Sequence, residues 1–113
     1  MKKSKIIQKE QEFTEIIHKY PYKKNNYFVI YYKPNPEKTR FGISVPTKTG
    51  KANIRNKIKR RVKNILVQNE NLVHSNFDYV IIIRKRILEL DYVTIKQELM
   101  SLIIKIGEKN EKK

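Results

Sequence analysis

The feature that most constrains this fold is an unbroken apolar run, Tyr-Val-Ile-Ile-Ile, at residues 79–83. A strand that is apolar at successive positions has to be covered on both faces, as central strands are. The run therefore predicts that residues 77–83 form a central strand of a sheet. The run falls far short of the ~20 residues that a membrane-spanning helix needs.

The remaining elements follow from apolar spacing and turn residues. Helical spacing marks three segments, at residues 9–19, 52–68 and 91–106. Asp91 suits the N-cap of the last helix, and Gly107 suits its end. β-Branched and aromatic residues mark two strands, 27–32 and 39–45. Because turn residues 34–38 separate them, we expect these strands to pair as an antiparallel hairpin.

The element order, α-β-β-α-β-α, predicts an α+β fold. The length of 113 residues suits one domain, residues 1–113, with a charged and frayed tail at 108–113. The chain has no cysteine, which excludes disulfides and thiolate metal sites. No apolar signal-peptide core follows the first residues, so we expect a cytoplasmic protein without a membrane partner.

Charge points to the class of partner. The chain carries 26 Lys and Arg against 11 Asp and Glu, a formal net charge of +15. Such a surplus on a small body favours a polyanionic partner. The cations concentrate in residues 48–63, and no acidic residue occurs between Glu37 and Glu70. The candidate RNA-binding residues are Lys48, Lys51, Arg55, Asn56, Lys57, Lys59, Arg60 and Lys63.

The alternative interpretation of this cationic helix is an ordinary solvated face. A face that serves only solubility mixes signs, because opposite charges four residues apart attract one another. Here like charges accumulate and repel. This repulsion costs free energy unless a polyanion neutralises the charges, so we favour a nucleic-acid surface.

Aromatic residues cluster on the predicted hairpin. The rings are Tyr27, Phe28, Tyr31 and Tyr32 on the first strand and Phe41 on the second. Each ring either fills the core or stacks on an unpaired base, which contributes ~1–3 kcal/mol per base. We expect Phe28 and Phe41 in the core, whereas the hydroxyl of Tyr31 tolerates a wet groove.

No catalytic or metal-binding pattern is apparent. The only histidines, His18 and His74, have no neighbouring ligand pattern, and we expect both at the surface. Asp78, at the start of a strand, is more typical of a turn or cap than of a general base. Gly50 is a lone turn glycine, so the chain has no glycine-rich loop for a dinucleotide cofactor. We therefore expect no protein-borne active site and no cofactor bound by the protein alone.

A longer pattern, residues 41–60, closely resembles the bacterial ribonuclease P protein family. It reads Phe-Gly-Ile-Ser-Val-Pro-Thr-Lys-Thr-Gly-Lys-Ala-Asn-Ile-Arg-Asn-Lys-Ile-Lys-Arg, a strand, a Lys-x-Gly-x-Ala turn and a basic helix. Phe13, residues 28–31 and residues 78–85 match the family in order and spacing. The resemblance implies a single-layer mixed sheet with helices and a left-handed βαβ crossover, contrary to the usual right-handed rule.

The resemblance also implies a function. Members of the family bind a catalytic RNA, and the ribonucleoprotein is an endoribonuclease that removes the 5′ leader from precursor tRNA. The RNA, with Mg²⁺, would perform the hydrolysis. By position, Arg55, Asn56, Lys59, Arg60 and Lys63 would belong to the helix that faces the catalytic RNA. The cleft for the leader would involve Phe13, Ile17, Tyr31 and Lys48.

The sequence departs from the family pattern at two of these positions. Lys57 replaces an arginine, which keeps the charge but loses the planar fork. Ile17 stands where the family often has an aromatic residue. The alternative function is a non-enzymatic RNA-binding module, such as a small ribosomal or RNA-chaperone protein. A DNA-binding protein is a weaker alternative, because no first helix of a helix-turn-helix precedes the basic helix.

Overall fold

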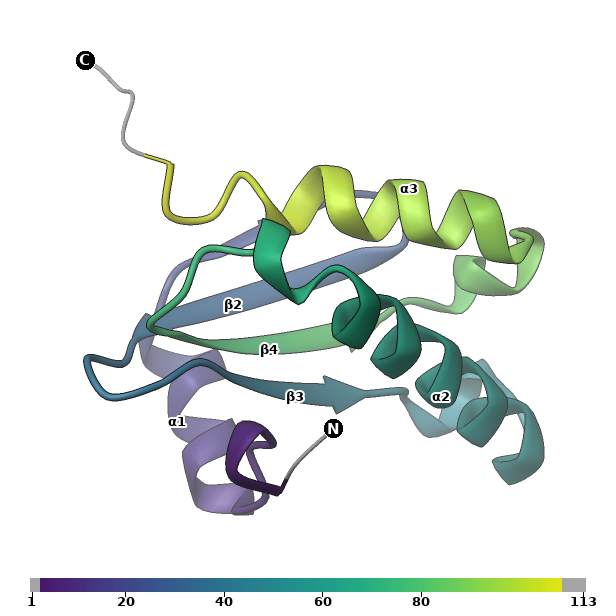
Figure 1. The fold of residues 1–113 in the computed structure, drawn as a ribbon. Helices are drawn as coiled ribbons and strands as arrows, with labels where there is room; N and C mark the ends of the chain where they lie inside the picture. Colours follow the sequence, from purple (N-terminus) through teal and green to yellow (C-terminus); the bar gives the residue numbers. More distant parts are fainter. Residues whose placement is uncertain (1–2, 109–113) are drawn as a thin grey trace.

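The computed structural model describes residues 3–108, which form three helices on the two faces of one sheet (Figure 1). The helices are α1 (Glu10–Lys19), α2 (Ala52–Gln68) and α3 (Tyr92–Ile103). The strands are β1 (Tyr22–Lys24), β2 (Phe28–Pro34), β3 (Arg40–Ser44) and β4 (Phe77–Ile83). The predicted frayed tail, residues 108–113, lies outside the described residues apart from Glu108.

The central place of β4 is confirmed. The strand order is β1-β2-β4-β3, and β4 pairs antiparallel with β2 and parallel with β3. The predicted hairpin is therefore wrong, because β4 lies between its two strands. Burial explains the difference: five of the seven β4 residues are buried, against two of seven in β2 and two of five in β3. The most apolar strand takes the position that is covered on both faces and paired along both edges.

β1 adds a strand that the sequence analysis missed. It is three residues long and pairs antiparallel with β2, with Tyr22 opposite Tyr31 and Lys24 opposite Val29. The segment Tyr-Lys-Lys is too short and too charged to show strand periodicity. Lysines are typical of edge strands, where they discourage pairing with another chain. The observed order is therefore α-β-β-β-α-β-α within the predicted α+β class.

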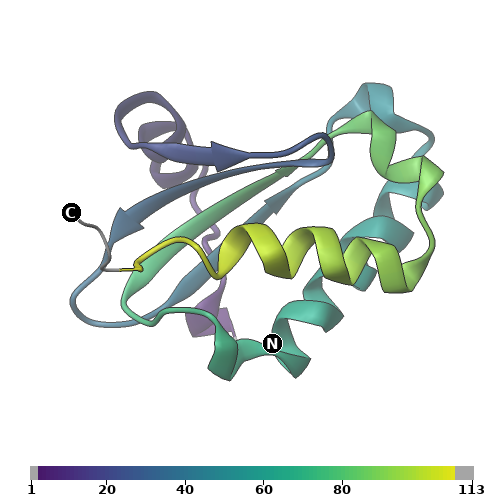
Figure 2. The same ribbon diagram turned by 90° about the horizontal axis from the view of Figure 1, so that it is seen from above.

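The connection from β3 through α2 to β4 is a left-handed crossover. In Figure 1, β3 and β4 both run from left to right, α2 lies in front of the sheet, and β4 lies above β3. Figure 2 confirms the layering, because α2 and α3 lie on one side of the sheet and α1 on the other. A chain that advances upward through a helix in front of such a sheet turns in the left-handed sense. The expected exception to the right-handed rule is present.

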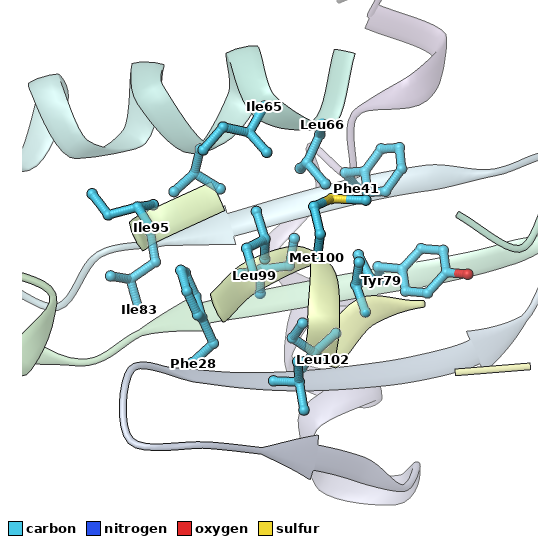
Figure 3. Close-up of a cluster of buried hydrophobic side chains, with 14 of the residues drawn as sticks. Phe28, Phe41, Ile65, Leu66, Tyr79, Ile83, Ile95, Leu99, Met100 and Leu102 are labelled. Carbon is cyan, nitrogen blue, oxygen red and sulfur yellow. The ribbon is translucent and has the colours of Figure 1, made fainter. Parts of the chain in front are cut away.

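The main core lies between the sheet and the helices α2 and α3 (Figure 3). Phe28 and Phe41 are fully buried there, as predicted, and Phe41 stacks on Tyr79 with ring centroids 5.5 Å apart. Two apolar residues whose helical spacing predicts a place in the core lie outside it: Ile54 is 38% exposed and Val93 is 62% exposed. Both lie in the first turn of their helices.

The predicted helix ends are largely confirmed. The carboxylate of Asp91 accepts a hydrogen bond from the backbone N–H of Thr94 at 2.9 Å, which is the expected N-cap contact. Gly107 has a φ of 91°, a conformation that favours glycine. α3 itself ends at Ile103, three residues before the predicted end, and buried Ile106 follows it in a turn.

A smaller cluster fixes α1 to the opposite face of the sheet. Ile7, Ile16 and Val80 are its buried members, and Phe13 and Ile17 pack against it. α1 approaches the sheet closely, since a Cβ atom at Gly42 would lie 2.7 Å from Cε2 of Phe13. This face carries one helix instead of two, so part of it stays uncovered. Within residues 3–108, no helix has the length and apolar character needed to cross a membrane, and the cytoplasmic location stays a prediction.

A buried ion pair joins α1, β3 and β4. The guanidinium of Arg40 donates to both carboxylate oxygens of Asp78, at 2.9 and 2.8 Å, and to both oxygens of Glu12, at 3.2 and 3.1 Å. The Asp78 side chain is 2% exposed and also accepts a hydrogen bond from Asn35 at 3.0 Å. Asp78 is thus a buried partner of Arg40 rather than the expected turn or cap residue. Its role depends on a residue 38 positions away, which local sequence does not show.

Substitution of Arg40 by methionine is expected to destabilise the protein by about 3–5 kcal/mol, because it leaves the Asp78 carboxylate buried without a cation. The measurement is urea-induced unfolding at neutral pH. Glu12→Gln is the matched control. The Glu12 side chain is 38% exposed, so its loss should cost less than about 1 kcal/mol. Equal losses in the two variants would contradict the assignment of Arg40–Asp78 as the dominant pair.

The same pair predicts a pH dependence. Burial raises the pKa of Asp78, but the hydrogen bonds from Arg40 and Asn35 outweigh it, and the pKa lies below its ordinary value. A lowered pKa in the folded state contributes stability above the unfolded-state pKa of about 3.9. That contribution disappears as the pH falls through the folded-state pKa. The free energy of unfolding should therefore drop below about pH 4 in the native protein and drop less in Arg40→Met.

Candidate RNA-binding surfaces

The basic face of α2 is the first candidate surface. Ile58, Val62, Ile65 and Leu66 turn towards the core, so the cations point away from the sheet. Among the predicted RNA-binding residues of this helix, Asn56, Lys57, Lys59 and Arg60 are exposed, and Arg55 and Lys63 are partly buried. The amphipathic pattern thus places a row of cations on the outer surface.

These cations are not neutralised internally. Within residues 3–108, none of the Lys and Arg side chains of α2 lies within 4.0 Å of a carboxylate oxygen. The observed ion pairs involve Lys5, Lys33, Arg40 and Arg86, all outside this helix. An unneutralised row of like charges is electrostatically costly and becomes favourable when phosphates approach it.

Arg55 differs from the other cations of α2. Its Nε donates a hydrogen bond to the backbone carbonyl oxygen of Gly50 at 3.1 Å. The bond ties the first turns of the helix to the loop that precedes it. Arg55 therefore holds the position of that loop, which carries Lys48 and Lys51.

A groove on the other face of the sheet is the second candidate surface. Its volume is about 540 Å³, and its floor includes Val29 and Ile82, one on each of two paired strands. Cations surround this apolar floor. They are Lys24, Lys48, Arg84, Lys85 and Arg86. No carboxylate lines the groove in the part of the chain that the structure describes.

Two tyrosines give the groove an aromatic end. Tyr22 and Tyr31 are opposite one another on β1 and β2, with ring centroids 5.1 Å apart and an angle of 50° between the rings. Tyr22 is 49% exposed, so its ring is accessible from solvent. Aromatic rings beside a row of cations suit single-stranded nucleic acid, because bases stack on the rings while phosphates meet the cations.

The four residues that the resemblance assigns to a leader cleft lie in one region, but only two of them line the groove. Tyr31 lines the groove together with Lys48. Phe13 and Ile17 lie on α1, where they pack against the same hydrophobic cluster as Tyr31. They form the adjoining α1–sheet contact, and a direct contact of either with a leader stays a prediction. Lys51 lies just before α2 and is exposed.

The sequence analysis missed part of this groove. Tyr22 and Lys24 lie on the short strand β1, whose pairing brings them beside Tyr31 and Val29. Arg84, Lys85 and Arg86 follow the central strand directly. An Arg-Lys-Arg run at the end of the most apolar strand is the one signal that could have located them.

The carboxylates within the described residues do not cluster as metal ligands. No three His, Cys, Asp or Glu side chains within residues 3–108 are placed to hold a metal ion together. Asp78 and Glu12 are both paired with Arg40. Arg40 therefore already neutralises these two carboxylates.

Comparisons with known proteins identify the family of this chain. The family model for ribonuclease P matches residues 1–107. The chain belongs to the ribonuclease P protein family. The ribonuclease P protein component of Mycoplasma capricolum is 45% identical over 108 residues, which cover 94% of this chain and 99% of the relative. That of a Geobacillus strain is 37% identical over 109 residues, covering 95% of this chain and 94% of the relative.

Solved structures of the family have the same fold. The ribonuclease P protein of Thermotoga maritima superposes with a TM-score of 0.85 at 33% identity, covering 90% of this chain and 97% of that one. The Staphylococcus aureus protein superposes with a TM-score of 0.83 at 30% identity, covering 94% and 97%. This ribonuclease P protein is therefore an RNA-binding component of an endoribonuclease complex in tRNA processing, and nothing in the comparisons favours a ribosomal or chaperone protein.

The basic face of α2 generates a salt-dependence prediction. Arg60→Gln should weaken binding to a folded RNA and reduce the slope of log K against log salt by about one unit, because one phosphate contact is lost. Binding is measured by titration at several KCl concentrations. Lys19→Gln, which removes an exposed charge from α1 on the other side of the sheet, is the control and should leave the slope unchanged. An unchanged slope in Arg60→Gln would remove Arg60 from the contact set.

Proposed function

We propose that the two basic surfaces bind two different RNAs. The α2 face docks on the catalytic RNA of ribonuclease P, and the groove holds the single-stranded 5′ leader of precursor tRNA. The observation that carries this proposal is the groove: tyrosines and cations around an apolar floor, on a different face from the α2 cations. One small protein then contacts enzyme RNA and substrate RNA at once.

Electrostatics supports this arrangement. Two RNAs repel one another, and a body with a net charge of +15 between them lowers that repulsion. The groove floor has little hydrogen-bonding chemistry, since Val29 and Ile82 are apolar. Stacking and phosphate contacts therefore dominate, which suits a leader whose sequence differs between precursors.

The protein acts by binding and orientation. No histidine or carboxylate lines the groove within the described residues, so the side chains around the leader include neither of the usual general bases. We infer that the catalytic RNA, with Mg²⁺ held by its own phosphates, performs the phosphodiester hydrolysis. The chain's own residues fix the leader near that site and neutralise charge.

Reconstitution tests this function. Addition of the protein to its cognate catalytic RNA should accelerate removal of the leader, most strongly at low Mg²⁺, where RNA–RNA repulsion is least screened. The measurement is the single-turnover rate on precursor tRNA with and without protein. No acceleration, together with tight binding to ribosomal RNA, would favour the non-enzymatic alternative.

Tyr31→Leu tests the groove. The substitution removes a stacking surface, so binding of leader-bearing precursor tRNA to the reconstituted complex should weaken about tenfold (~1.4 kcal/mol). Mature tRNA, which lacks the leader, should bind as it does to the native complex. Tyr20→Leu is the matched control, because Tyr20 packs against the same hydrophobic cluster but does not line the groove. Equal losses for both tRNAs would mean that Tyr31 acts only in packing.

A further inference from the structure

A shallow hollow between α2 and the start of α3 has a chemistry that the rest of the basic face lacks. Its lining consists of Lys57, Arg60, Arg61, Lys63, Asn64 and Tyr92. The α2 residues recur at the spacing of one helix face, and Tyr92 is the first residue of α3. An aromatic ring thus stands at the edge of a row of cations.

Tyr92 is held in place there. One part of its side chain packs against the main core, and its hydroxyl lies 3.4 Å from the amide nitrogen of Asn64. The residue is only partly buried, so some of the ring stays accessible within the hollow. A ring fixed on one side and accessible on the other is a preorganised stacking surface.

The combination of groups distinguishes between forms of RNA. Double-stranded RNA presents phosphates and a shallow minor groove, which cations can meet without help from an aromatic ring. An unpaired nucleotide presents a base face as well as its phosphates. Tyr92 offers a ring for the base, Asn64 offers an amide for its edge, and the neighbouring Lys57 and Arg60 offer donors for the phosphates.

We propose that this hollow binds an unpaired nucleotide of the catalytic RNA, with its base stacked on Tyr92. The inference rests on the proposed function, because it concerns the RNA that docks on α2. It adds a site for one extruded or single-stranded base within a surface that otherwise contacts phosphates. It also makes Tyr92, outside the basic helix, a binding residue.

A fluorescent reporter tests the stack directly. The chain has no tryptophan, so Tyr92→Trp places a single indole in the hollow. Its emission should be quenched when the catalytic RNA binds, because a stacked base quenches indole. A short oligoadenylate should quench it as well, and a blunt RNA duplex should quench it much less. Val93→Trp is the matched control, since Val93 is the next residue, is 62% exposed and does not line the hollow.

Affinity gives an independent measurement. Tyr92→Leu should weaken binding of the catalytic RNA about tenfold while leaving the salt slope unchanged, because a stack rather than a phosphate contact is lost. Tyr92→Phe keeps the ring and should bind within about twofold of the native protein. Thermal unfolding of each variant checks that the core beneath residue 92 remains intact.

Distinct outcomes separate this inference from the proposed function. If Arg60→Gln weakens RNA binding but Tyr92→Leu binds like the native protein, the stacking site is wrong and the docking surface stands. Equal quenching of Tyr92→Trp and Val93→Trp would also overturn the site. A shallower salt slope in Tyr92→Leu would show that the ring only positions the cations. A native protein that fails to bind the catalytic RNA would overturn both proposals.

Discussion

The structure depends on the burial of β4. This strand is apolar at both faces and pairs along both edges, so the three helices and the two neighbouring strands are arranged around it. α2 and α3 cover one face, and α1 covers part of the other (Figure 2). At its first residues the strand carries one carboxylate, Asp78, and the fold places Arg40 and Asn35 around it so that no charge is buried alone.

The uneven cover of β4 separates the two candidate RNA-binding surfaces. α2 and α3 cover one face of the sheet, and the outer side of α2 presents the charges of an amphipathic helix. The face under α1 is only partly closed, and the uncovered part of β2 and β4 becomes the floor of the groove. Three helices around a four-stranded sheet thus produce one convex cationic surface and one aromatic groove.

Acidic and basic residues are distributed unevenly over the described chain. The acidic residues of the described chain are paired with cations, placed at helix starts or located away from α2, as Glu12, Asp78 and Asp91 illustrate. The cations of α2 have no such partners among residues 3–108. A protein that neutralised them internally would have a more stable exterior and a weaker attraction for RNA. Under the proposed function, RNA phosphates would neutralise this unpaired row.

Local pattern determined much of this protein. The bounds of α2 and β4, the Asp91 cap and the cationic face all follow from periodicity and residue type over one element. Tertiary structure alone decided that β4 separates β2 from β3, that Tyr22 lies beside Tyr31, that Asp78 meets Arg40 and that Tyr92 borders the basic helix. The physical reason is range: periodicity reports which face of an element is buried, whereas pairing and site assembly depend on which distant segment covers it.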